Sequence, residues 1–586
     1  MGIQVLFFTA ALLLLPSPAA SPGSPVEEVL TVAGLNGEPG GRLIYSERTE
    51  PRTLNPLAAS DPASRDVIHQ MHADLIHINR ATLATEPALA KSCRISADGL
   101  RYVVELRQGL RFSDGQPLDA DDILFTWQVY LDEKIGSPQR NLWILDGRPV
   151  VVRKIDAYRV EFRMPGVNAV GERVFDSVPI LPRHLLEGPY REGRLHDVWN
   201  LRARPAEIAG MGPFRLKEVV PSQRVVLERN PYYWKLDASG RRLPYLDELD
   251  FALAGTEDMQ VMRFQAGESD VVSRIGAKDY AALGRESARR GYVLVDAGPG
   301  FEYSFLFFNL NPLPAGSPLA AKQAVWRRPP FRRAISAAID RAAIVRLVYR
   351  GYASPLGSPV AAGNKPWLDA HLAAPARSVT HARELLAADG FQWSKEGKLL
   401  DPDGRPVQFS ILASSTNQER TQTATLIQAD LKELGVAAEV VPLEFRSLSD
   451  RVTRTHDFEA CISAIMSTDA DPTADLNVWL SSGGQHYWNP FEKTPVTPWE
   501  AEIDTLMRTQ MVTRDPVARK RLFDRVQEIA MEYVPLIPLV TPHLLLGVRK
   551  DLGNFRGVAL DPYAIWNTEE LYWRRAEKQP AGRARQ

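Results

Sequence analysis

Four aspartates lie close together between residues 114 and 122, where their spacing invites a metal-binding interpretation. Asp114, Asp119, Asp121 and Asp122 supply oxygen ligands of the kind that Ca²⁺ prefers. An EF-hand loop, however, places its ligands at alternate positions and ends on a glutamate, and this stretch does neither. Asp119 instead precedes an apolar run at a helix N-cap position, and Asp122 follows it by three residues. We therefore predict turn and capping roles for these acids.

Motifs for catalysis are missing from the sequence. It contains no Gly-x-Ser-x-Gly elbow, no Walker loop and no His-Glu-x-x-His zinc motif. The ten histidines show no paired-ligand spacing, and we interpret His184, which lies two residues after Pro182, as structural. Sequence alone does not separate a glycosidase carboxylate pair from solvated acids, so a secreted carboxylate-based hydrolase stays open as an alternative.

The two cysteines, Cys93 and Cys461, lie far apart and in no metal-ligand spacing. A disulfide in an oxidising compartment and two free thiols both stay open, and neither cysteine is assigned a function. No metal and no cofactor is expected.

The composition is that of a soluble globular protein. The chain has 586 residues, a formal net charge of −1, 45% hydrophobic residues and 24% charged residues. Near-neutral charge argues against a general nucleic-acid or anionic-membrane binder. The length predicts about three or four domain-sized units, or fewer larger ones.

The N-terminus predicts export. An apolar run at residues 5–15 precedes small residues such as Ala19 and Ala20, which is typical of a signal peptide over residues 1–20. The run is too short for a stable membrane anchor, and no cysteine follows it to carry a lipid. No Lys or Arg precedes the run, which a misassigned start codon would explain. We expect a freely soluble periplasmic protein.

Hydrophobic periodicity predicts a mixture of strands and helices around these residues. The stretch 102–107 alternates as a strand, and 150–155 with 158–162 forms a hairpin. Further strands and helices follow, with strands at 303–309, 436–441, 458–465 and 536–540 and helices at 376–390, 420–434, 499–511 and 515–533. The pattern is α/β with mixed sheets.

Several ordered motifs together resemble the family 5 extracellular solute-binding proteins, the oligopeptide- and dipeptide-type receptors of ABC importers. They are Phe112-Ser-Asp-Gly-Gln-Pro-Leu118, Gly210-Met-Gly-Pro-Phe214, Asn230-Pro-Tyr-Tyr-Trp-Lys235 and Arg332-Arg-Ala-Ile-Ser-Ala-Ala-Ile-Asp-Arg341. The resemblance covers roughly residues 42–570. It implies a type II periplasmic-binding-protein fold of two lobes, with an extra domain inserted near the N-terminus.

The resemblance also implies domain boundaries. After the signal peptide it gives a flexible lead-in at 21–40, lobe one at 41–60, 200–305 and 520–575, the inserted domain at 61–199, lobe two at 306–519, and a disordered tail at 576–586.

The segment 463–473 resembles the family's ligand strand and the acidic loop that follows it. In peptide-binding relatives, an aspartate four residues before the proline often holds the peptide's amino group. Thr468 occupies that position here, Asp469 comes one residue later, and Asp471 takes the family's Asp-Pro position. Either Asp469 shifts into the amine-binding role, or the ligand has no free amine at this point.

Five further residues complete the predicted ligand site. Relatives often have Gly-Trp before the loop, whereas this chain has Ala464-Ile465-Met466, and we include Ala464 and Met466 in the predicted site. Glu50 and Thr53 fall where relatives approach the ligand backbone. Trp488 is a candidate for stacking on the ligand, with a core anchor as the alternative.

These features predict a periplasmic receptor that captures peptides between two lobes and delivers them unchanged to ABC permease subunits. We expect a monomer that is not an enzyme and does not bind nucleic acid. An oligosaccharide or other non-peptide solute is the alternative ligand within this class. A chaperone-like binder of unfolded proteins is a further alternative, beside the hydrolase.

Overall fold

The computed structural model describes residues 27–145, 147–176, 178–314 and 316–574. The predicted signal peptide at 1–20 and the predicted disordered tail at 576–586 lie outside the described residues. Helices and mixed sheets occur along the whole described chain, which confirms the expected α/β class. Within these ranges, none of the helices combines the length and the apolarity that crossing a membrane requires.

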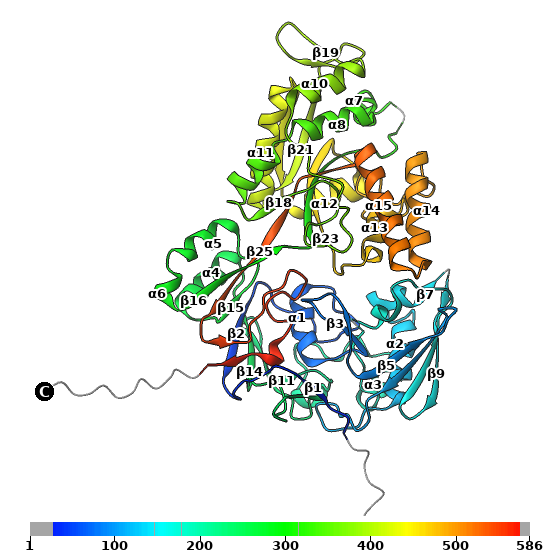
Figure 1. The fold of residues 1–586 in the computed structure, drawn as a ribbon, viewed down its shortest axis with the longest axis vertical. Coiled ribbons are helices and arrows are strands. Elements are labelled where there is room, and N and C mark those ends of the chain that lie inside the picture. The colour runs from blue at the N-terminus through cyan, green and yellow to red at the C-terminus, as the bar shows by residue number, and fades with distance from the viewer. Residues whose placement is uncertain (1–26, 146, 177, 315, 575–586) are drawn as a thin grey trace, which may run out of the picture.

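Two large hydrophobic cores divide the molecule into two bodies (Figure 1). The first core gathers side chains from residues 43–271 and 544–571 and forms the lower body in Figure 1. The second core gathers side chains from residues 303–540 and forms the upper body. The chain therefore passes from the first core to the second near residue 302 and returns near residue 540.

An eight-stranded sheet lies in the first body, with strand β2 (Arg42–Glu47) near its centre. Strand β2 runs parallel to its neighbour β14 (Glu248–Leu253), and its last residue, Glu47, is carried into the interior. The remaining strands of this sheet are β11 (Phe214–Val220), β12 (Arg224–Arg229), β15 (Val271–Val272), β16 (Tyr292–Pro299), β18 (Ala353–Pro355) and β25 (Val540–Arg549).

A five-stranded sheet organises the second body, in the order β22, β21, β23, β17, β24. Strand β17 (Glu302–Phe308) is buried over almost its whole length, as its continuous apolar run predicts. Strand β23 (Ala460–Met466) pairs antiparallel with β17, so that Met466 lies opposite Glu302. The other members are β21 (Gln408–Ser414), β22 (Ala437–Leu443) and β24 (Leu536–Pro538).

A smaller sheet joins the first core and is covered by helix α2 (Ala120–Leu131). Asp119 caps α2, and the Asp122 side chain accepts a hydrogen bond from the backbone N–H of Asp119, which confirms the capping prediction. Trp127 of α2 packs on Phe162 with 4.7 Å between ring centroids. The strands of this sheet are β5 (Ala90–Ile95), β6 (Arg101–Leu106), β9 (Val151–Asp156) and β10 (Arg159–Arg163).

The remaining elements cover the sheets or connect them. The longer helices are α1 (Pro62–Met71), α3 (Arg183–Arg191), α4 (Glu257–Ala266), α5 (Ala277–Gly284), α7 (Ala320–Trp326), α8 (Pro329–Ala338), α10 (Val379–Ala388), α11 (Gln418–Glu433), α14 (Pro498–Val512) and α15 (Pro516–Tyr533). Short elements are α6 (Ser287–Arg290), α9 (Arg341–Ala343), α12 (Phe445–Asp450), α13 (Leu476–Trp479), β3 (Ile76–Ile78), β4 (Thr85–Pro87), β7 (Ile144–Leu145), β8 (Arg148–Pro149), β19 (Gln392–Trp393), β20 (Leu399–Leu400), β26 (Leu552–Gly553) and β27 (Tyr572–Trp573).

Two details bear on the expected domain boundaries. Helix α15 packs in the second core through side chains such as Phe523 and Val526, so the packing favours a last boundary near Val540 rather than at residue 520. The predicted flexible lead-in contains strand β1 (Leu30–Val32), which pairs in parallel with β13 (Lys235–Asp237), and its described part is therefore packed rather than loose. The other boundaries stay predictions.

Both cysteines are free thiols. Cys461 is buried in β23, and Cys93 is half-buried in β5.

Candidate functional site

A cavity of about 650 Å³, larger than two others described below, lies where the two cores meet. From the first core it is lined by residues of the segments 56–80 and 138–179. From the second core it is lined by the loop after β23 and by the end of α14. A loop that returns late in the chain adds Asp561. The volume falls within the range of about 300–1,000 Å³ that is usual for small-molecule sites.

The lining of this larger cavity has an apolar part and a charged part. The apolar part includes Leu142, Leu145, Met164, Val167 and Met511. The charged part consists of Arg65, Arg80, Arg173, Asp176, Asp469 and Asp561. A ligand with both apolar and charged groups would find partners for each.

Four of these charged residues form two ion pairs. Arg80 Nη2 lies 3.0 Å from Asp176 Oδ2, inside the first core. Burial opposes ionisation of Asp176, yet Arg80 and His77 hold its pKa below the usual value. Arg173 Nε donates to Asp469 Oδ2 over 3.3 Å, and this pair joins residues of the two cores.

A cluster of three carboxyl groups adjoins the same cavity. Asp561 lines it, while Glu47, at the end of β2, and Asp66, on α1, are buried, with exposed fractions of 7% and 8%. Burial raises the pKa of Glu47 to about 7. Burial, followed by the charges of Asp561 and Glu47, raises the pKa of Asp66 well above its usual value. Burial and mutual repulsion therefore oppose full ionisation of the cluster, and Glu47 is only partly ionised near pH 7.

A second cavity, of about 170 Å³, lies where the chain crosses between the cores. Glu302 at the start of β17 pairs with Arg274 at 3.3 Å and with Arg420 at 3.2 Å. Met466 also lines this cavity, and the Tyr563 hydroxyl donates to its sulfur over 3.0 Å.

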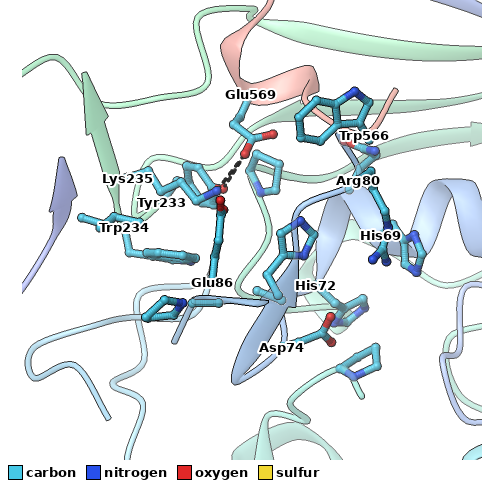
Figure 2. Close-up of a pocket in the computed structure, with 18 of the residues that line it drawn as sticks. His69, His72, Asp74, Arg80, Glu86, Tyr233, Trp234, Lys235, Trp566 and Glu569 are labelled. Carbon is cyan, nitrogen blue, oxygen red and sulfur yellow. Dashed lines mark hydrogen bonds and ion pairs between the residues drawn. The ribbon is translucent and has the colours of Figure 1, made fainter. Parts of the chain in front are cut away.

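A third cavity, of about 110 Å³, lies inside the first core (Figure 2). Figure 2 shows Lys235 turned toward Glu569, and the two are 2.9 Å apart. Burial lowers the pKa of His72 to about 3 and that of His77 to about 4, so both imidazoles are neutral near pH 7. Asp74, His77 and Asp176 bring potential ligand atoms within 4.8 Å of one another, but Arg80 already neutralises Asp176.

The structure brings only part of the predicted site together. Thr468 and Asp469 line the larger cavity, and Met466 lines the second. Ala464 lies within β23, opposite Ser304 of β17, and does not line any of the three cavities. Asp469 already has Arg173 as its partner, so its carboxylate is not free to hold an amine in this conformation.

Four predicted residues point to internal partners instead of a cavity. Asp471 forms a buried pair with Arg519 at 2.8 and 2.9 Å and caps the turn after it, so that it stabilises the loop. Trp488 is 1% exposed in the second core, and its Nε1 donates to Glu500 over 2.9 Å.

Glu50 accepts from the Ser222 N–H over 2.6 Å, and the Thr53 hydroxyl accepts from the Asn55 N–H over 3.0 Å. Neither lines any of the three cavities. Ligand contact by any of the eight predicted residues stays a prediction.

Sequence reasoning missed Glu47, Asp66, Arg173 and Asp561. No short motif contains them, because they come from a strand end, a helix, a turn and a late loop that meet only in the folded chain. A signal for Asp66 existed, since it is an acidic residue directly before the apolar pair Val67 and Ile68 of a helix.

The sequence model of the protein family "Bacterial extracellular solute-binding proteins, family 5 Middle" matches residues 84–487 of this chain. A "Probable ABC transporter-binding protein" of Deinococcus radiodurans is 25% identical over 525 residues, which are 85% of this chain and 86% of that protein.

Two solved structures are similar in fold. The oligopeptide-binding protein AppA of Bacillus subtilis, in complex with a nonapeptide, has a TM-score of 0.69 and 23% identity, over 92% of this chain and 100% of that one. The periplasmic binding protein MelB of Agrobacterium fabrum, in complex with stachyose, has a TM-score of 0.68 and 21% identity, over 93% and 86% of the two chains. These likenesses confirm the predicted periplasmic-binding-protein fold.

Proposed function

Because this chain belongs to the bacterial extracellular solute-binding proteins of family 5, we propose that it captures peptides outside the cytoplasm and delivers them to the permease of an ABC importer. The observation that carries this proposal is the cavity of about 650 Å³ between the two cores. Its apolar part suits peptide side chains, and its charged part suits the charged groups of a peptide.

The path of the chain supports capture by closure. The chain crosses between the two sheets at the start of β17 and between β24 and β25. Bending at these two crossings would move the second core away from the first and open the cavity, as in hinge closure around a ligand. The residues of the Arg173–Asp469 pair would separate in the open state.

The receptor releases its ligand unchanged. It acts as a periplasmic monomer that is neither an enzyme nor a nucleic-acid binder, and its solute passes to membrane subunits. The formal net charge of −1 supports the absence of nucleic-acid binding.

Native mass spectrometry of the purified protein tests this function, because a captured peptide travels with the chain as a defined added mass. A thermal-shift screen with peptides of two to six residues follows. A ligand at 100 times its Kd raises the free energy of unfolding by about 2.7 kcal/mol. Peptides that neither co-purify nor shift the transition would overturn the peptide assignment.

An oligosaccharide ligand is the second candidate, because Thr468 replaces the carboxylate expected for an amine and a similar fold holds stachyose. Tri- and tetrasaccharides in the same screen test it. Recovery of the ligand as smaller products would instead support the hydrolase.

A further inference from the structure

Of the three acidic residues in the larger cavity, Asp561 is the one for which the described part of the chain supplies no ion-pair partner. The other two, Asp176 and Asp469, are held by Arg80 and Arg173. Among the described residues, no Lys, Arg or His nitrogen lies within 4.0 Å of the Asp561 carboxylate. Its charge is therefore available to whatever enters the cavity.

Glu47 and Asp66 lie within electrostatic range of Asp561, and their raised pKa values leave them protons to lose when a cation binds. Among the described residues no other group donates to the buried Oε2 atom of Glu47 or Oδ1 atom of Asp66, and the two carboxyl groups hydrogen-bond to each other when one of them is protonated. The charge of Asp561 contributes to the raised pKa of each of these two carboxyl groups. Unsatisfied buried carboxyl oxygens are costly, so the native state gains free energy if a donor reaches them.

The cations around the cluster are partly committed elsewhere. Arg48 donates to Gln260 and pairs with Glu257 at 3.4 Å. Arg274 pairs with Glu302 at 3.3 Å.

Arg65 lines the cavity and donates to the Ser60 carbonyl over 2.9 Å, and it lowers the pKa of Asp66 without cancelling the effects of burial and of the neighbouring carboxylates.

His69, Tyr45 and Tyr563 also lie within electrostatic range of Asp561. Burial lowers the pKa of His69 and so favours its neutral form. A tyrosine hydroxyl carries no positive charge, and burial raises the pKa of both tyrosines, which keeps them neutral.

We propose that Asp561, backed by Glu47 and Asp66, anchors a positively charged group of the ligand, either an ammonium or a guanidinium. This inference rests on the proposed function and specifies its ligand class as peptides that carry a cation into the larger cavity. A cation there can donate a charge-assisted hydrogen bond to Asp561, and it favours ionisation of Glu47 and Asp66 by lowering their raised pKa values. The anchor comes from the first core, whereas the resemblance placed amine recognition on the loop of the second core.

Matched tetrapeptides test the anchor in isothermal titration calorimetry. One pair is Ala-Ala-Ala-Ala with a free and with an acetylated amino terminus. The other is acetyl-Ala-Lys-Ala-Ala and acetyl-Ala-norleucine-Ala-Ala, which differ in the side-chain charge. We expect at least one pair to show about tenfold tighter binding of the cationic member, a difference of about 1.4 kcal/mol.

The variant Asp561→Asn keeps the size of the side chain and removes its charge. We expect it to reduce this preference to less than threefold while neutral peptides keep their affinity. Asp403→Asn, an exposed aspartate of the second body, is the matched control and should keep the full preference. If Asp561 had a purely structural role, Asp561→Asn would weaken the binding of neutral and cationic peptides equally.

Proton release provides a second readout. A bound cation lowers the pKa of Glu47 from about 7, so binding near pH 7 should release protons. The binding enthalpy of the cationic peptide should then change with the ionisation enthalpy of the buffer, and that of the neutral peptide should not.

The outcomes separate the two proposals. If no peptide of either kind binds the wild-type protein, the proposed function fails. If peptides bind but charge makes no difference, or if Asp561→Asn keeps the preference, the anchor is wrong and the peptide receptor stands.

Discussion

Arg173 and Asp469 form an ion pair across the larger cavity, and the pair joins the two cores of the molecule. Arg173 also donates to the Leu83 carbonyl over 2.7 Å, which fixes the guanidinium within the first core. The side chains are 17% and 25% exposed, so the pair is only partly screened by solvent. It therefore favours the closed arrangement of the two bodies.

A double-mutant cycle measures what this pair contributes. We expect Arg173→Ala and Asp469→Ala to weaken peptide binding, because each leaves a charged partner at the cavity wall. The coupling free energy should be about 1 kcal/mol, as for a partly exposed pair. Additive effects of the two substitutions would show that the pair does not contribute to closure.

Asp471 and Arg519 form a second pair, which is buried inside the second body. Arg519→Met removes the cation and leaves a buried carboxylate, so we expect the free energy of unfolding to fall by about 3–5 kcal/mol. Urea denaturation measures this loss. Arg454→Met, at an exposed pair with Asp450, is the control and should change little.

The same pair predicts a response to acid. Arg519 holds the pKa of Asp471 below its usual value against the effect of burial. A depressed carboxyl pKa stabilises the fold above the unfolded pKa, and this stability is lost as pH falls through the folded pKa. Arg519→Met should therefore flatten the acid side of the stability profile.

Local chemistry predicted the elements better than the site. The capping box of Asp119 and Asp122 depends on residues three apart, so the sequence contains all of its information. Strand β23 and helix α11 likewise agree with the ranges that their periodicity predicts. Tertiary packing alone brings Asp561, Asp66 and Glu47 together, and their spacing in the sequence does not predict this cluster.

The resemblance supplied part of what periodicity could not. It pointed to the loop after β23, where Thr468 and Asp469 indeed line the larger cavity. It did not indicate that Arg173 forms an ion pair with Asp469, because that arginine lies in the part of the chain expected to form the inserted domain.

The raised pKa of Glu47 predicts that the free energy of unfolding depends on pH between about pH 5 and pH 7. Its pKa is about 7 in the folded state, against 4.5 for the free side chain. Between these values the unfolded chain binds fewer protons than the folded chain, so stability falls as pH rises through this window. Glu47→Gln should reduce the slope of the free energy of unfolding against pH between pH 5 and pH 7 by at most about the contribution of one proton. The contribution of Asp66 to that slope should remain. Urea denaturation at each pH measures the slope, and an unchanged slope would contradict the raised pKa.

Substitution of Trp488 tests whether its side chain contacts the ligand or only the second core. Because it is fully buried and donates to Glu500, Trp488→Phe should lower the free energy of unfolding by about 1–3 kcal/mol through the lost hydrogen bond. The folded variant should bind peptides with unchanged Kd.

Leu142, which is 52% exposed and lines the larger cavity, should behave in the opposite way. Leu142→Ala should weaken binding of peptides with bulky apolar side chains by about threefold to tenfold, because part of their apolar contact is lost, with little effect on stability. Calorimetry and urea denaturation on both variants separate the two roles. If Trp488→Phe reduced affinity and Leu142→Ala did not, the ligand would have to bind near Trp488 rather than in the larger cavity.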